Sequence, residues 1–173
     1  DPTLGVEMAS TGEVGCIGED FNAALLLAMQ ASGVHRPKKG VLVSSGSEKD
    51  KLRFLPSAKV FQRLGLPLYA TKGTAEYLKS HGFEVTALDW PGEGDNDVLK
   101  VIKSDLVDFV INIPKNSQRT ELTRGSQIRQ SAVRFGCSLL TNMEKVSAFV
   151  HALDKTEDFV DKHELLVLPD YRC

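Results

Sequence analysis

Two threonines, a lysine and a glycine stand together at residues 71–74, in the order Thr-Lys-Gly-Thr. An apolar run at residues 67–70 precedes them and a helical pattern follows them. The N-terminus of a helix has unpaired backbone N–H groups and a partial positive charge, so it attracts anions. Gly73 permits close approach of a ligand to the backbone, and Thr71 and Thr74 can each donate a hydroxyl hydrogen bond. The turn therefore predicts a phosphate site, the alternative being that Thr74 only caps its own helix.

Apolar runs alternate with helical stretches along the chain. Strands are predicted at residues 41–43, 68–71, 85–88, 108–113 and 138–141. Helices are predicted through residues 58–64, 75–80, 95–103, 123–135 and 144–153, with an extra helix at 21–31 before the first strand. Strict alternation, with strands that are apolar on both faces, predicts an α/β protein with a three-layer, doubly wound, five-stranded parallel sheet. The apolar run at residues 165–168 is a candidate for an added edge strand.

Polar side chains follow every predicted strand. In folds of this class ligands bind beyond the carboxyl ends of the strands, near the reversal of strand order. The strand ends deliver hydroxyls, amides and lysines, together with one Asp and one Trp: Ser44, Ser45, Lys49, Lys51, Thr71, Lys72, Gly73, Thr74, Asp89, Trp90, Asn112, Lys115, Asn116, Thr141 and Asn142. No carboxylate pair is recognisable among them, and no His or Cys stands beside a base. The sequence predicts a binding site with no catalytic residue.

Composition narrows the ligand classes. The chain has 173 residues and a formal net charge of -2, which indicates neither a nucleic-acid-binding nor a membrane-binding surface. No apolar run approaches the roughly 18 residues that a membrane span needs. The 3 cysteines and 4 histidines share no metal-ligand spacing, so no metal site is predicted. A small anionic molecule is the partner that the strand ends favour.

Several stretches resemble one known family. Residues 10–15 read Ser-Thr-Gly-Glu-Val-Gly and lead into Gly18-Glu19, which resembles the join between the last ATP-using module of carbamoyl-phosphate synthetase and its C-terminal allosteric domain. Further stretches resemble the allosteric domain itself, which has the methylglyoxal-synthase-like fold: residues 50–51, 58–59, 64–65, 70–75, 110–112 and 128–132. The chain begins without Met and without a targeting pattern. We therefore expect residues 1–17 to be the tail of a preceding synthetase module with its linker, and residues 18–173 to be the regulatory domain.

The resemblance implies a sensor attached to an enzyme. The whole synthetase makes carbamoyl phosphate from bicarbonate, ammonia and ATP, so ATP and Mg²⁺ are expected for the full-length protein and no cofactor for this chain alone. The expected partners are the synthetase modules of the same chain and a small anionic effector. The expected effector-binding residues are Ser44, Lys49, Lys51, Thr71, Lys72, Gly73, Thr74, Trp90, Asn112, Lys115 and Asn116.

Two effector classes are open. Family members of pyrimidine synthesis, which are cytoplasmic, respond to the uridine nucleotides UTP, UDP or UMP, often opposed by phosphoribosyl pyrophosphate. The urea-cycle type, which is mitochondrial, requires N-acetylglutamate, and Trp90 and Asn112 match positions used for that ligand. We favour a uridine nucleotide, because a glycine in the turn and lysines after the first strand suit phosphates. Arg129-Gln130, where the family often has two arginines, and Pro114, where some nucleotide binders have a hydroxyl, depart from that pattern.

Two readings of other classes remain. Methylglyoxal synthase shares the fold, but its catalytic Asp follows the fourth strand, where residues 112–117 of this chain read Asn-Ile-Pro-Lys-Asn-Ser. Catalysis by this chain alone is therefore not expected. The other reading is an assembly or linker module whose pocket binds nothing.

Overall fold

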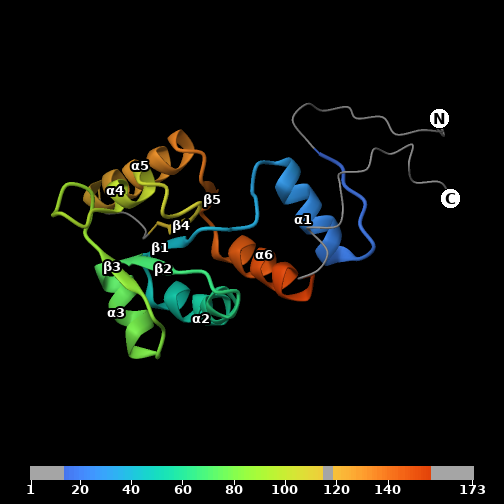
Figure 1. The fold of residues 1–173 in the computed structure, drawn as a ribbon, viewed down its shortest axis with the longest axis horizontal. Coiled ribbons are helices and arrows are strands. Elements are labelled where there is room, and N and C mark those ends of the chain that lie inside the picture. The colour runs from blue at the N-terminus through green and yellow to red at the C-terminus, as the bar shows by residue number, and fades with distance from the viewer. Residues whose placement is uncertain (1–13, 115–118, 157–173) are drawn as a thin grey trace.

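The computed structural model describes residues 14–114 and 119–156, and within them the fold is built on one parallel sheet (Figure 1). The five strands lie in the order β3-β2-β1-β4-β5, and every pair of neighbours is parallel. Their bounds are β1 (Val41–Ser45), β2 (Leu68–Thr71), β3 (Thr86–Leu88), β4 (Phe109–Ile113) and β5 (Ser138–Leu140). The predicted five-stranded parallel α/β fold is confirmed.

Helices cover both faces of the sheet. One face packs against α2 (Glu48–Arg63), α3 (Lys72–Ser80) and α6 (Met143–Lys155). The other face packs against α4 (Val98–Lys103) and α5 (Arg119–Arg134). The first helix, α1 (Phe21–Ala31), lies against α6 and beyond the sheet (Figure 1). The three layers are those that the alternating sequence predicts.

The central strands explain why the sequence shows no alternation of apolar and polar residues. Every residue of β1 and β4 is buried, because both faces of these strands are covered. Val43 packs on the α2 and α6 side, whereas Leu42 packs on the α4 and α5 side. The larger core cluster contains a run of aromatic contacts formed by Phe54, Phe61, Phe109 and Phe149.

Several element boundaries differ from the predicted ones in a way that matters for function. The helix predicted through residues 58–64 begins already at Glu48, so Lys51 is helical. β1 continues past residue 43 through Ser44 and Ser45, which pair with β4. The helix predicted from residue 75 begins at Lys72, so the Thr-Lys-Gly-Thr segment is the start of α3 and not a loop. The helix predicted from residue 95 begins at residue 98, because the Asp97 side chain caps it by accepting the Leu99 N–H. The run at residues 165–168 lies outside the described residues.

Candidate functional site

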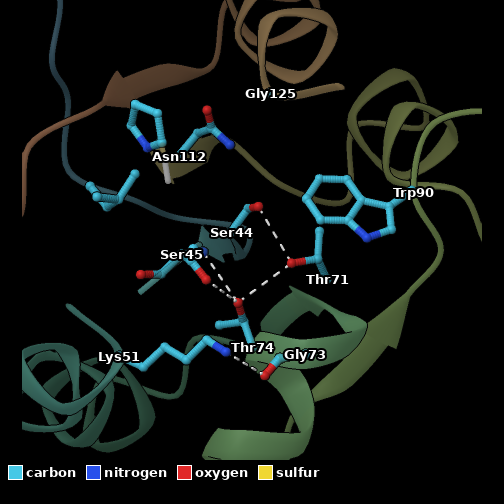
Figure 2. A pocket seen from close by; sticks show the side chains of 12 residues that line it. Ser44, Ser45, Lys51, Thr71, Gly73, Thr74, Trp90, Asn112 and Gly125 are labelled. Carbon is cyan, nitrogen blue, oxygen red and sulfur yellow. Dashed lines mark hydrogen bonds between the residues drawn. The ribbon is translucent and has the colours of Figure 1, made fainter. Parts of the chain in front are cut away.

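A pocket lies at the carboxyl ends of the central strands, where the strand order reverses between β1 and β4 (Figure 2). Ligands of open α/β sheets bind at this place. As bounded by the described residues, the pocket holds about 200 Å³, below the roughly 300–1,000 Å³ of typical small-molecule pockets. It is therefore sized for the anionic end of a ligand. The described residues that line it are Ser44, Ser45, Gly46, Lys51, Thr71, Gly73, Thr74, Trp90, Asn112, Ile113, Pro114 and Gly125.

The predicted site residues fall into three groups. The pocket brings together Ser44, Lys51, Thr71, Gly73, Thr74, Trp90 and Asn112. Lys49 and Lys72 are exposed and are not among the described lining residues. Lys115 and Asn116 lie outside the described part of the chain. Their roles as effector ligands stay predictions.

The Thr-Lys-Gly-Thr segment presents a helix N-terminus to the pocket. Thr71 is the N-cap residue of α3, and its side chain makes no capping hydrogen bond. Backbone N–H groups in the first turn of a helix have no intrahelical partner. Because both Thr71 and Gly73 line the pocket, this uncapped turn faces the cavity. An anion there would meet N–H donors and the positive end of the helix dipole.

Thr74 does not cap its own helix, so that alternative is wrong. Its hydroxyl instead bridges α3 to β1: Oγ1 accepts the Ser45 N–H and donates to the Ser45 carbonyl, each over 3.2 Å (Figure 2). Thr71 Oγ1 lies 3.4 Å from Ser44 Oγ and 3.5 Å from Thr74 Oγ1. Hydroxyl hydrogen bonds usually span about 2.7–2.8 Å, so these contacts are long. The hydroxyls satisfy one another only weakly.

One buried hydroxyl of the pocket has no partner at all among the described residues, and it belongs to Ser45. A buried donor left unpaired costs roughly 1–3 kcal/mol. The buried polar side chains in the described part of the chain number eight, and five of them line this pocket: Ser44, Ser45, Thr71, Thr74 and Asn112. Buried hydroxyls without good partners indicate a place where a polar ligand completes the bonding.

Lys51 supplies a positive charge from α2. Its Nζ donates to the Gly73 carbonyl over 3.0 Å and lies 5.8 Å from the centroid of the Tyr77 ring. The ammonium therefore stands beside the first turn of α3. Among the described residues, a carbon placed at Cβ of Gly73 would meet only Lys51 Nζ, at 3.8 Å, which is an ordinary contact. Neither packing nor backbone conformation requires a glycine at residue 73.

Lys72 is engaged elsewhere. Its Nζ lies 2.7 Å from Asp89 Oδ1, and the hydrogen bond to that carboxylate, with its charge, raises the pKa of Lys72 above the ordinary lysine value. This pair joins the start of α3 to the residue that follows β3. Asp89, the one carboxylate that directly follows a predicted strand, is therefore held in an ion pair and is not among the described residues that line the pocket.

Asn112 of β4 and Trp90, which follows β3, also line the pocket. Arg129 Nη1 donates to Asn112 Oδ1 over 2.6 Å. Gly125 allows this contact, because a Cβ there would lie 3.0 Å from Arg129 Nη1 and 3.4 Å from Asn112 Oδ1. Trp90 lies beside Thr71 on the β3 side of the cavity (Figure 2). The pocket thus has a hydroxyl-rich floor, an amide and an aromatic wall.

The prediction misses several lining residues. Ser45 is noted at the end of the first strand but is not included among the predicted effector-binding residues. Ile113 is the last residue of the predicted strand at 108–113, Pro114 follows it directly, and Gly46 comes three residues after the strand at 41–43, so their positions in the sequence could have indicated them. Gly125 could not be found in this way, because it reaches the pocket only through the packing of α5 over β4.

The described lining contains no Asp, Glu, His or Cys. Within residues 14–114 and 119–156, no group of three or more metal-ligating side chains is found. None of the helices in these ranges is long and apolar enough to cross a membrane. The donors present are hydroxyl, ammonium, amide and backbone N–H groups, all suited to holding an anion.

Comparison with known proteins gives a consistent picture. The model of the MGS-like domain family matches residues 53–141. The multifunctional protein pyr1-3 of Dictyostelium discoideum is 40% identical over 159 residues, covering 88% of this chain and 7% of that protein. The multifunctional protein CAD of Squalus acanthias is 36% identical over 193 residues, covering 98% of this chain and 9% of that protein. The mitochondrial carbamoyl-phosphate synthase (ammonia) of Homo sapiens is 37% identical over 177 residues, covering 99% of this chain and 12% of that protein. The chain therefore spans only about a tenth of the length of these relatives.

Proposed function

The chain belongs to the family of MGS-like domains, and from that premise we propose that it is the regulatory domain of a carbamoyl-phosphate synthetase and binds a small anionic effector. The observation that carries this proposal is the pocket between β1, β4 and the N-terminus of α3. Its described lining offers hydroxyls, Lys51 and an uncapped helix turn, and includes no carboxylate. Such a site holds negative charge and has no described group that would act as a base.

The activity that the domain regulates lies in the rest of a longer protein. We propose that the full-length protein is an ATP-dependent ligase, with ATP and Mg²⁺ bound by synthetase modules outside this chain. An effector changes such an activity only through its different affinities for active and inactive states. The coupling is typically about 1–3 kcal/mol, or roughly 5- to 150-fold in affinity.

We favour a uridine nucleotide as the effector. The relatives do not decide between the classes, because the multifunctional proteins and the mitochondrial ammonia-using synthases are 34–40% and 37% identical, respectively. The pocket does favour phosphate: Gly73 is left open toward it, and the uncapped turn of α3 stands beside the Lys51 ammonium. Trp90, on the wall, can stack on the base. With a uridine nucleotide as effector, the full-length protein would be cytoplasmic. With N-acetylglutamate as effector, it would be mitochondrial.

Calorimetry on the 173-residue chain tests the proposal. We expect UMP to bind saturably and N-acetylglutamate to bind weakly or not at all. Lys51→Met should weaken UMP binding and flatten its salt dependence, because salt screens a charge contact more than a neutral one. Lys59→Met, on the exposed side of α2, is the matched control and should bind like the unaltered chain.

The same titrations separate the other readings. N-acetylglutamate binding without nucleotide binding would establish the urea-cycle type. No saturable binding of UMP, phosphoribosyl pyrophosphate or N-acetylglutamate would establish an assembly module. Turnover of dihydroxyacetone phosphate to methylglyoxal by the purified chain would contradict the prediction that it is not catalytic by itself.

A further inference from the structure

Arg124 contacts the aromatic wall of the pocket without lining the pocket itself. Its guanidinium carbon lies 5.8 Å from the centroid of the Trp90 ring, within cation–π range. The same guanidinium forms an ion pair with the Glu93 carboxylate. Trp90 lines the cavity, whereas Arg124 is not among its described lining residues. Any effect of Arg124 on a ligand would therefore pass through Trp90.

The segment that carries Trp90 is held by hydrogen bonds to its own neighbours along the chain. The buried Asp97 carboxylate accepts the Gly92 N–H over 2.7 Å and the Leu99 N–H over 2.6 Å, and Lys100 Nζ of α4 donates to the Gly94 and Asp95 carbonyls over 3.4 and 3.3 Å. The Asp89 N–H also donates to the Asn96 carbonyl over 2.9 Å. Trp90 and Glu93 also both contact Arg124, which belongs to a different element, α5. Arg124 thus joins this segment to the helix that also holds Asn112 through Arg129.

We propose that Arg124 is a positioning residue that sets the orientation of the Trp90 indole for the flat part of the ligand. The inference rests on the proposed function. Through Trp90, Arg124 would contribute to the recognition of the aromatic base of the ligand and not of its phosphate. A guanidinium suits this role, because its planar face stacks on indole while its N–H groups pair with a carboxylate. Glu93 keeps that plane in place over the ring.

Trp90 is the only tryptophan of the chain, so intrinsic tryptophan fluorescence reports on this ring alone. In the unliganded chain, Arg124→Met should change the Trp90 emission, because it removes both the cation and the link to Glu93. UMP affinity should fall about two- to fivefold, the value of an exposed cation–π contact. Affinity for inorganic phosphate, the probe that has no base, should not change. Arg124→Lys, which keeps a cation for both partners, should restore most of the UMP affinity.

Arg134→Met is the matched control. Arg134 is on the same helix and lies 6.0 Å from the Phe135 ring, away from the pocket, so its loss should alter neither the emission nor UMP binding. A double-mutant cycle completes the test: in a Trp90→Leu background, Arg124→Met should have no further effect on UMP affinity.

The outcomes are distinct. An equal loss of UMP and phosphate affinity, or an undiminished loss in the Trp90→Leu background, would show that Arg124 acts on the anion and would overturn the inference. Unchanged emission and UMP affinity in Arg124→Met would overturn it too while leaving the proposed function standing. Failure of UMP to bind the unaltered chain would instead contradict the proposed function, on which the inference rests.

Discussion

The aromatic core and the pocket floor are equally buried but are stabilised in opposite ways. Phe109 and Phe149 are fully enclosed and stack on each other, with ring centroids 5.2 Å apart. Thr71 and Thr74 are only 2% exposed, yet their hydroxyl contacts to neighbouring hydroxyls are 3.4–3.5 Å long. In the core, burial removes apolar surface from water and stabilises the fold. In the pocket floor, burial removes hydroxyls from water and returns only weak bonds.

This difference shows which region is optimised for stability and which for a ligand. A pocket floor built only for stability would pair the Ser45 hydroxyl or replace it by an apolar group. The chain keeps that buried hydroxyl without a partner among the described residues. It also keeps a glycine at residue 73, where the surroundings would accept a Cβ. Substitutions in the two regions should therefore affect stability and binding in different proportions.

Phe109→Ala should produce the largest loss of stability. Phe109 contacts two further rings of the core, with centroids 6.3 Å from Phe61 and 5.2 Å from Phe149. Truncating a buried Phe typically costs about 3–5 kcal/mol, because a cavity remains. Urea denaturation would measure the loss, and UMP affinity at low denaturant should stay unchanged for the folded molecules. A loss below about 1 kcal/mol would mean that this cluster does not dominate the core.

The sequence predicted this core better than it predicted the pocket. The apolar runs that became β1 and β4 identify buried strands by themselves, since both faces of a central parallel strand are covered. The strand-end rule also identifies Ser44, Lys51, Thr71 and Asn112, all of which line the pocket. The rule also selects Lys72, because it takes no account of the ion pair that Asp89 forms with the Lys72 ammonium.

Other features of the site depend on packing between distant segments. Gly125 approaches Asn112 only because α5 crosses β4, and Arg124 reaches Trp90 only because α5 lies beside the segment after β3. The bridge from Thr74 to the Ser45 backbone joins residues far apart in the chain. No local pattern of apolar and polar residues contains such information.

Thr74→Val should give an intermediate effect that is split between stability and binding. The valine keeps nearly the same volume but leaves the Ser45 N–H and carbonyl without the hydroxyl that serves both. Loss of a buried partner costs about 1–3 kcal/mol of stability. UMP affinity should fall too, since Thr74 lines the pocket. Urea denaturation and calorimetry on the same sample measure the two losses.

Thr86→Val is the control for that change, because Thr86 is an exposed residue of the edge strand β3. It should alter neither stability nor binding by more than about 0.5 kcal/mol. If Thr74→Val behaves in the same way, the bridge to β1 is unimportant and the pocket floor is as tolerant as the surface.

Gly73→Ala should have the smallest effect on stability, and of the opposite sign. Glycine in a helix is less stable than alanine by about 0.5–1 kcal/mol, and in the described part of the chain a Cβ at residue 73 meets no closer atom than Lys51 Nζ at 3.8 Å. The unliganded domain should therefore gain up to that amount in urea denaturation. The new methyl group would stand in the pocket, where overpacking costs about 1–3 kcal/mol, so UMP affinity should fall at least fivefold.

Gly65→Ala provides the contrast, because Gly65 has a φ of 71° and alanine is strained there, so stability should fall while binding is kept. A Gly73→Ala chain that is more stable and binds UMP unchanged would show that no ligand approaches this turn, and the phosphate site would have to lie elsewhere.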